Sequence, residues 1–294
     1  MVAVTLAADG RTVAPPAEPA LRLPRRLRLS RAAVEHLADR TGTPLPWERG
    51  RRPSADAQDP VAELRRHHLV TPDGRIDPEV VGAWAVLGYP EVLVDVDVSV
   101  RRSDAPAGFV HLHSWQRRRC GRVASLSTAG GRLLELGWHD DDLWQVELAR
   151  AVTVRTPSAP GPPPAAVVDL PHELLLGSGA ALRLHREDVL ADLERRHAGG
   201  VHVDDDPVPL GPATTDAQVR RLHAAAVGRM RTVVAGVGTR GARRIGWVSW
   251  LLFPDGWRAL VPQFRDGQPR VRLQPVAPLR LGAEVARLVV EVRS

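Results

Sequence analysis

The clearest pattern of hydrophobic and polar positions lies between residues 91 and 100. Valines occupy every second position from Val92 to Val100, and a mostly polar set that includes Asp95 and Asp97 alternates with them. Successive side chains of a strand point to opposite faces of its sheet. The alternation therefore predicts a strand with one buried face.

Further short runs of strand-forming residues are separated by turns that contain glycine or aspartate. Strands joined by short turns in chain order are typical of an antiparallel meander. The predicted strands occupy residues 108–116, 121–128, 131–139 and 144–152, and later residues 243–253, 257–264 and 270–276.

Helix-start signals and helical spacing predict the other elements. Ser30 is a suitable N-cap, and Asp59 and Asp77 each precede a proline at the first helical position. In the second half, apolar residues recur at helical spacing between Asp216 and Val234. The predicted helices are residues 30–40, 59–68, 77–88, 167–177, 184–197, 216–234 and 278–292.

The strand predicted at residues 243–253 is apolar on both faces. Its odd positions include Ile245 and Trp247, and its even positions include Trp250 and Leu252. An antiparallel sheet with one face in water should alternate with polar residues instead. Either helices cover both faces, or one face is kept for a partner protein, for which Trp and Arg are preferred anchors.

A proline-rich segment, residues 156–166, divides the chain. Regular structure is not expected there, nor in the Ala/Pro-rich residues 1–26, which we expect to form a flexible arm. The two halves are then residues 27–155 and 167–294. We predict an α+β fold in which each half consists of helices and an antiparallel meander and a quasi-twofold axis relates the halves.

An internal repeat supports this division. With an offset of 125 residues, the meanders align without a gap and share glycine or aspartate at turns and valine or leucine in strands. The matched pairs are Gly121 and Gly246, Val123 and Val248, Gly131 and Gly256, Asp141 and Asp266, Val146 and Val271, and Leu148 and Leu273.

Composition favours a soluble cytoplasmic protein. The 294 residues contain no uninterrupted apolar run of the ~18 residues that a bilayer requires, and we expect no cleaved secretory signal. A single cysteine, Cys120, excludes an internal disulfide. All 40 basic residues are arginine and the net charge is +6, which is weak evidence for nucleic-acid binding.

Candidate catalytic and metal-binding residues are few. His111 and His113 would share one face of a strand, and the acidic runs at residues 139–142 and 202–206 could complete a hydrolytic metal site. We favour a simpler interpretation, in which these aspartates lie at turns and stay solvated. The segment GVGTRG, residues 236–241, does not follow a strand and precede a helix, so it does not indicate a dinucleotide site. We predict no catalytic residue, no cofactor and no metal.

A DNA-binding function remains an alternative. The helices within the first 90 residues, followed by the segment LVTPDGRI at residues 69–76 and surrounded by arginines, could form a winged helix. Against this, the helix that would read bases, residues 60–69, carries few base-reading side chains and no dense basic face.

The order of these segments resembles the EspG family, the cytosolic chaperones of actinobacterial type VII (ESX) secretion. The likeness runs from about residue 27 to 294, and the phrase DGRIDPEVV followed by YPEVLVDVDV, within residues 73–98, carries it most clearly. The other segments that carry it are LRLSRAAVEHLADR, VVDLPHELL and GWVSWLLFPDGWRALVP.

The resemblance implies a chaperone without enzymatic activity that shields the apolar tip of a PPE protein in a PE/PPE heterodimer. It also implies that the partner is bound through the central sheet and the helices of the C-terminal half. Separately, we expect a monomer or a weak homodimer, since an edge strand of either meander could pair two copies. A host without PE/PPE proteins would need a related WXG-type client. The partner-binding residues expected from these regions are Arg229, Arg231, Arg244, Trp247, Trp250 and Leu252.

Overall fold

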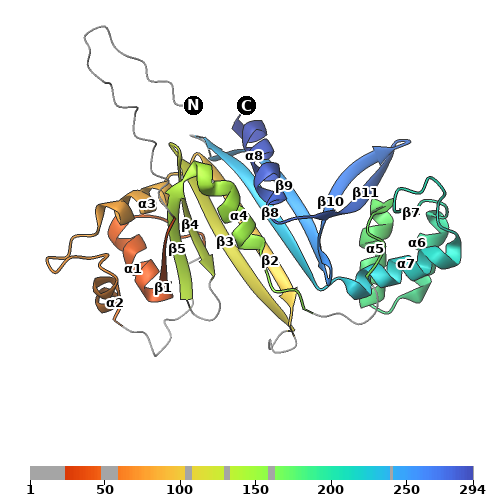
Figure 1. The fold of residues 1–294 in the computed structure, drawn as a ribbon, viewed down its shortest axis with the longest axis horizontal. Coiled ribbons are helices and arrows are strands. Elements are labelled where there is room, and N and C mark those ends of the chain that lie inside the picture. The colour runs from red at the N-terminus through yellow and green to blue at the C-terminus, as the bar shows by residue number, and fades with distance from the viewer. Residues whose placement is uncertain are drawn as a thin grey trace, which may run out of the picture.

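A computed structural model describes residues 24–47, 59–102, 108–128, 133–157, 163–238 and 241–293. In these residues eleven strands form one sheet, in which every neighbouring pair is antiparallel (Figure 1). The strand order is β1-β5-β4-β3-β2-β8-β9-β10-β11-β6-β7. The strands are β1 (Arg25–Ser30), β2 (Val92–Arg101), β3 (Phe109–Arg119), β4 (Arg122–Thr128), β5 (Leu133–Asp140), β6 (Val168–Pro171), β7 (His202–Val203), β8 (Gly228–Gly238), β9 (Gly241–Phe253), β10 (Gly256–Arg265) and β11 (Gln268–Val276).

Helices cover much of this sheet, and the α+β class is confirmed. The helices are α1 (Arg31–Thr41), α2 (Pro60–Arg66), α3 (Pro78–Gly88), α4 (Trp144–Val152), α5 (His172–Arg183), α6 (Glu187–Arg196), α7 (Pro212–Ala225) and α8 (Arg280–Arg293). The predicted N-caps are confirmed, because Ser30, Asp59 and Asp77 each accept a hydrogen bond from a backbone N–H in the first turn. No helix in the described part of the chain has the length and apolar composition that a membrane span requires.

The helices lie on both faces of the sheet (Figure 1). Helices α4 and α8 cover one face at its centre and bury a cluster that includes Val94, Met230 and Trp250. We call this the covered face. On the other face, α1, α2 and α3 bury a second cluster over β4 and β5, and α5, α6 and α7 bury a third over β6 and β11. Within the described residues, helices therefore cover the centre of the sheet on one side only.

The centre of the sheet joins the two halves of the chain. Strand β2 pairs with β8 from Val92 opposite Gly236 to Val100 opposite Gly228. From this pair the order runs outward as β3, β4, β5 in one direction and as β9, β10, β11 in the other, and α4 and α8 follow the two meanders. Helices α4 and α8 also touch, since a Cβ on Gly282 would lie 2.6 Å from the Gln145 Cβ.

The repeat alignment predicted with an offset of 125 residues is wrong. It matches Gly121, which has φ 73° in the β3–β4 turn, with Gly246, which lies inside β9. It also matches Val146, in α4, with Val271, in β11. By element order β5 corresponds to β11, which begins 135 residues later. Chance identities at turns and strands therefore produced the shorter offset.

Three predicted elements need correction. Residues 144–152 form helix α4 and not a strand, because Trp144, Leu148 and Val152 bury one helical face. The predicted helix at 216–234 begins earlier, at Pro212, and ends at Ala225, since the following residues alternate as strand β8. Residues 168–171 form strand β6 before helix α5 begins.

The predicted segment boundaries are only partly described. Strand β1 begins at Arg25, within the predicted arm, and residues 1–23 of the arm lie outside the described residues. Residues 158–162 of the predicted linker also lie outside them. The winged-helix alternative finds little support, because α2 spans only seven residues and a single bridge, between Val70 and Ile76, stands where a wing is needed.

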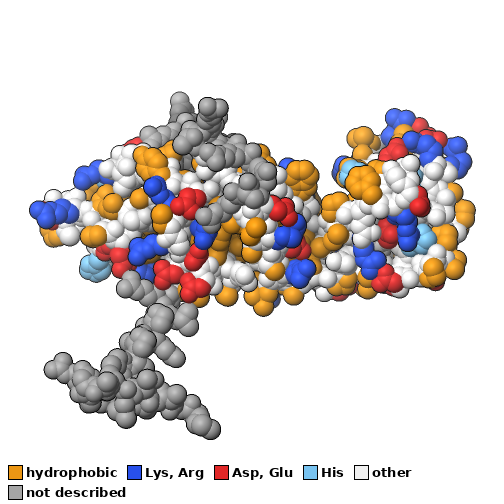
Figure 2. Space-filling view, turned by 90° about the horizontal axis from the view of Figure 1, so that it is seen from above, with side chains coloured by type: hydrophobic (Ala, Val, Ile, Leu, Met, Phe, Trp, Pro, Cys, Tyr) orange, Lys and Arg blue, Asp and Glu red, His pale blue; other side chains and the backbone are white. Residues whose placement is uncertain are grey.

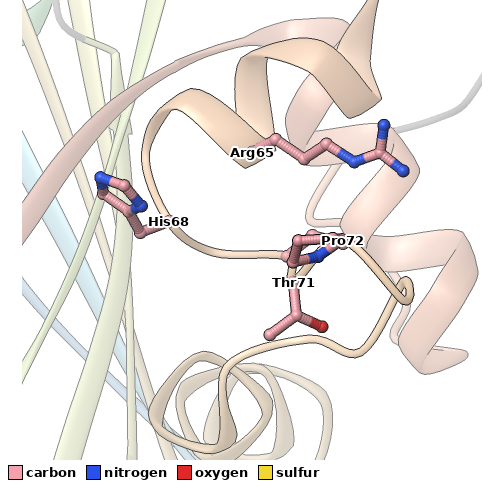
Figure 3. Close-up of a pocket in the computed structure, with 5 residues that line it drawn as sticks. Arg65, His68, Thr71 and Pro72 are labelled. Atoms are coloured by element: carbon pink, nitrogen blue, oxygen red, sulfur yellow. The ribbon is translucent and has the colours of Figure 1, made fainter.

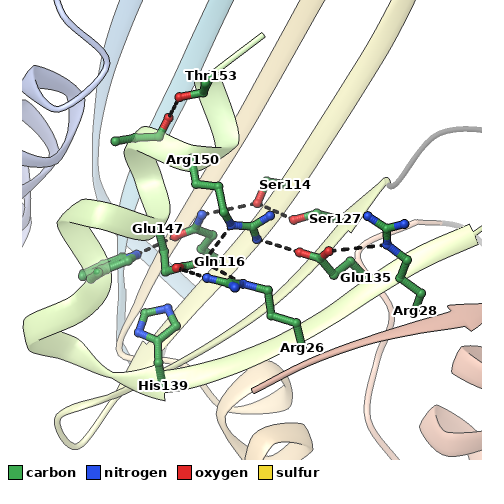
Figure 4. A network of polar contacts seen from close by, with 12 residues as sticks. Arg26, Arg28, Ser114, Gln116, Ser127, Glu135, His139, Glu147, Arg150 and Thr153 are labelled. Carbon is green, nitrogen blue, oxygen red and sulfur yellow. Dashed lines mark hydrogen bonds and ion pairs between the residues drawn. The ribbon is translucent and has the colours of Figure 1, made fainter. Parts of the chain in front are cut away.

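A partly buried ion-pair network fixes α4 to the edge of the sheet (Figure 4). Glu147 on α4 pairs with Arg26 on β1 and accepts a 2.9 Å bond from Arg150 Nε. Arg150 also pairs with Glu135 on β5 at 2.6 Å. Burial alone would raise the pKa of Glu147, but the hydrogen bonds from the two arginines outweigh it and lower that pKa.

We expect Glu147→Ala to lower the free energy of unfolding by about 2 kcal/mol, because it leaves Arg26 and Arg150 without their shared carboxylate. The loss is smaller than for a fully buried pair, since both arginines are partly exposed. Urea unfolding of the two proteins measures it. Glu291→Ala, on the exposed side of α8, is the matched control. Equal losses in both variants would show that the network adds no stability.

Candidate partner-binding site

Between the two helix groups, one side of the central strands is uncovered. We define the open face as the side of β2, β8 and β9 that carries Asp95, Arg231 and Trp247. These side chains share a face because Asp95 lies opposite Val233 and Val233 lies opposite Trp247 in the antiparallel registers. The helices α1–α3 stand on one side of this face and the bundle α5–α7 on the other (Figure 1).

Strand β9 shows why its sequence is apolar on both faces. Its even positions, which include Val248 and Trp250, are buried on the covered face beneath α4 and α8. Its odd positions differ along the strand. Phe253 is buried against the helix bundle, whereas Ile245 and Trp247 are 61% and 65% exposed on the open face. An apolar surface of this kind, rimmed by polar residues, is typical of a protein-interaction site.

The structure separates the predicted partner-binding residues into two groups. Trp247 is exposed on the open face, and Arg229 and Arg231 are exposed on the neighbouring strand β8. Trp250 and Leu252 are each 1% exposed and belong to the core of the covered face. Their prediction as contact residues is corrected here, because even and odd positions of a strand point to opposite faces. The side chain of Arg244 lies outside the described residues.

The open face carries both signs of charge in neighbouring rows. On β2, Asp95 pairs with Arg117 at 2.6 Å and Asp97 pairs with His113 at 3.1 Å. On β8, Arg229 and Arg231 make no ion pair with any other residue in the described ranges. Two exposed guanidinium groups beside an exposed Trp are therefore available to a partner.

An aromatic row next to the open face was predicted only in part from the sequence, which placed His111 and His113 on one strand face but did not include Trp115. On β3, the rings of His111 and His113 stack, and His113 stacks on Trp115 with centroids 5.6 Å apart. Trp115 also contacts Trp47, which follows α1. The row extends the open face towards an apolar pocket of about 260 Å³, lined in part by Leu45 and Trp115. The period-two spacing of residues 111, 113 and 115 could have revealed it.

Side-chain clusters that would suggest catalysis are scarce. No group of three or more His, Cys, Asp or Glu side chains among the described residues is placed to share a metal ion. The pocket of about 370 Å³ in Figure 3 is lined by Arg65, His68, Val70, Thr71 and Pro72, with Arg65 directed away from His68. This pocket presents no carboxylate beside its basic groups.

Within the described ranges, the hydroxyl of Ser178 lies within hydrogen-bond distance of His223, but this Ser–His pair is structural. Ser178 on α5 is fully buried, and its hydroxyl donates to the Leu174 carbonyl one turn earlier. His223 Nε2 on α7 lies 2.9 Å from the same oxygen and must donate to it, since the hydroxyl proton is already used. The ring packs on Gly179, where a Cβ would lie 2.8 Å from His223 Cε1. The pair joins α5 to α7 and leaves no room for a substrate.

The His223 pair predicts a pH dependence of stability. Burial, and then the positive charge of Arg183, lower the pKa of His223 from 6.5 to about 4. The folded state thus favours the neutral ring, so this stability is complete above pH 6.5 and is lost as the pH falls towards 4. Between pH 7.5 and 5 we expect a loss of about 2 kcal/mol.

Urea unfolding of the wild type and of His223→Gln at both pH values isolates this contribution. Glutamine keeps an N–H donor for Ser178 but does not titrate, so the variant should lose about 2 kcal/mol less than the wild type. The same pH dependence in both proteins would show that other groups cause it.

The comparisons with known proteins give one informative result. No protein-family model matches the chain, and no curated protein matches it. Among solved structures, the chain is similar to the Mycobacterium tuberculosis type VII secretion system chaperone EspG5, solved in complex with a PE25–PPE41 dimer. The TM-score is 0.53 and the identity 15%, over 89% of this chain and 95% of EspG5. The EspG-like fold expected from the sequence is confirmed.

Proposed function

We propose that this protein is a cytosolic chaperone that binds and shields a PPE-type, or related WXG-type, substrate of an actinobacterial type VII secretion system. The observation that supports it best is the likeness of fold to a chaperone solved with its PE25–PPE41 dimer, over nearly the whole of both chains. The open face adds a physical reason, since this fold leaves an apolar and charged strip of sheet exposed between two helix groups.

The client is proposed to bind along the open face of β8 and β9. Trp247 supplies a large exposed apolar surface, and Arg229 and Arg231 supply charged donors beside it. Interfaces of standard size bury ~1,600 Å² in total and depend on a few Trp, Tyr and Arg anchors. The prediction of Arg244 as a partner contact rests on the sequence alone, and Arg244 is not counted among the open-face residues, because it shares the even positions of β9 with Trp250.

The two helix groups beside the open face, α1–α3 and α5–α7, explain how a bound client would be shielded. A helical tip placed on the open face would contact the sheet below and a helix group on either side. Its apolar surface would then be buried and no longer in contact with solvent. Release would require no chemical step, because only noncovalent contacts hold the client. The proposed function therefore needs no catalytic residue and no cofactor, and it involves neither nucleic acid nor a membrane.

The proposed chaperone is built from two quasi-twofold-related halves, 27–155 and 167–294, and is a monomer or a weak homodimer. The matching order of strands on either side of the β2–β8 pair supports the relation between the halves. So does the placement of α4 and α8, which follow corresponding strands and share the covered face.

Affinity purification of the tagged protein from its native host tests the proposal. We expect a PE/PPE or WXG-type pair to co-purify in equal molar amount and to stay bound at high salt, since apolar contacts resist screening. Nucleic acid that is released by salt, with no secreted protein bound, would reject the proposal and favour the DNA-binding alternative.

A further inference from the structure

Strands β9 and β10 diverge after a short stretch of pairing. Strand β9 pairs with β8 from Gly241 to Leu252, with one register shift, but with β10 only from Trp250 to Phe253. Strand β10, in turn, pairs with β11 from Trp257 to Arg265. Figure 1 shows the β10–β11 hairpin leaning away from β9. A groove of about 520 Å³ lies between the two strands and is closed on one side by α8.

The register shows which backbone groups face this groove. The bond from Val237 N–H to the Glu91 carbonyl directs the odd positions of β8 towards β2 and its even positions towards β9. Even positions of β9 are therefore bonded to β8, and its odd positions are directed to β10. The pair of Trp250 with Ala259 uses the Ser249 C=O, which accepts from the Leu260 N–H. Beyond it, the N–H groups of Ile245, Trp247 and Ser249 and the C=O groups of Ile245 and Trp247 enter the groove without a partner in the described chain.

Strand β10, on the opposite side of the groove, is poorly suited to pair with an added strand. By the same alternation, Leu260, Pro262 and Phe264 of β10 direct their backbone groups to the groove. Pro262 has no N–H to donate, and proline on an edge strand protects that edge from pairing. The free edge of β9, residues 245–249, is thus the side of the groove that can accept a strand.

The charged side chains of α8 at the edge of the groove indicate what kind of segment could bind there. Arg280, Glu284 and Arg287 of α8 line the groove. The two arginine side chains are 67% and 64% exposed, whereas the Glu284 side chain is 22% exposed. Arg280 lies 3.9 Å from Glu284, and Arg287 pairs with Glu291 at 2.5 Å along α8. The three charged side chains that line the groove still sum to a positive charge, which favours an occupant that carries a carboxylate. Figure 2 shows hydrophobic side chains beside charged ones at the waist of the molecule.

We propose that β9 binds an extended, acidic segment of a partner protein as an added strand, through the backbone of Ile245, Trp247 and Ser249. A second copy of this chain does not fit, because its own β9 edge is recessed behind its β10–β11 hairpin in the same way. A narrow free segment enters the groove where a folded sheet edge does not. This site adjoins the open face at Trp247, whose backbone borders the groove and whose side chain lies on the open face, but it binds through backbone groups and not through that side chain.

Amide hydrogen exchange by NMR tests the free edge first. In the free protein, the amides of Ile245, Trp247 and Ser249 should exchange at least about tenfold faster than those of Gly246, Val248 and Trp250, which are bonded to β8. Slow exchange at the odd positions would overturn the proposal, since it would show that another part of the chain already occupies the edge.

A synthetic peptide of alternating valine and threonine with a glutamate at each end then serves as the probe. We expect it to bind the full-length protein with Kd below ~1 mM and to protect the three odd amides. N-methylation of one alternate set of its residues should weaken binding at least about tenfold, and N-methylation of the other set should not. No binding, or equal binding of both N-methylated peptides, would overturn the proposal.

The rim is tested with the double variant Arg280→Glu, Arg287→Glu. It should weaken binding of the glutamate peptide about tenfold, and Arg221→Glu, an exposed change on α7, should leave it unchanged. An equal effect of both variants would reject the acidic character of the occupant.

Discussion

Trp250→Ala should lower the free energy of unfolding by about 4 kcal/mol, the largest loss that we expect from any single change in β9. The Trp250 side chain is 1% exposed and packs beside Trp257 with ring centroids 6.2 Å apart. Its removal leaves a cavity between the sheet and the helices α4 and α8 that neither helix can fill without losing other contacts. Guanidinium unfolding of the purified variant measures the loss.

Trp247→Ala, three residues earlier, is the matched control for stability. Its side chain is largely exposed, so the free energy of unfolding should change by less than about 0.5 kcal/mol. If Trp250→Ala were as stable as the wild type and failed only to bind a client, Trp250 would be a contact residue and its placement in the core would be incorrect.

Client binding should show the reverse order. We expect Trp247→Ala to weaken binding of a PPE-type client about 30-fold, because an exposed Trp at the centre of an interface is a typical hot spot worth ~2 kcal/mol. Arg229→Ala and Arg231→Ala should each have a smaller effect. Calorimetric titration with a purified PE/PPE pair gives the three dissociation constants.

Val290→Ala provides the control for this series. Val290 is 70% exposed on α8, which covers the opposite face of the sheet, so its removal should leave the affinity unchanged. Loss of affinity in Val290→Ala together with normal affinity in Trp247→Ala would place the client on the α8 side and contradict the proposed site.

Much of the local structure could be predicted from the sequence where one physical signal dominated. The alternating valines of β2 are buried at every second position, and the Asp–Pro pairs at residues 59–60 and 77–78 begin helices. In each case one chemical requirement, either a buried strand face or a capped helix start, outweighs the alternatives.

The sequence was misleading where two periodicities overlap. Met230 and Val233 fit the helical spacing that begins in α7, yet they lie in β8, where Met230, Thr232 and Val234 are buried at every second position. Gly228 allows that strand to approach β2, because a Cβ there would lie 2.6 Å from the Ser99 carbonyl oxygen. Such tertiary contacts decide between helix and strand, and a single sequence does not show them.

The candidate site could be predicted only in part for the same reason. The doubly apolar pattern of β9 identified the strand, but it did not say which face α8 covers. Trp247, Arg229 and Arg231 lie on the open face, whereas Trp250 and Leu252 lie beneath the helices. The contact between Trp47 and Trp115 joins residues far apart in the chain, so only the folded arrangement of the segment after α1 against β3 reveals it.

Site-specific photo-crosslinking tests most directly the central claim, that the open face holds the client. A benzophenone amino acid in place of Arg231 lies on the open face, and in place of Val290 it lies on α8 on the other side of the sheet. In complexes with a PE/PPE pair, we predict a covalent product with the PPE protein from position 231 and none from position 290. A product from position 290 alone would contradict the account.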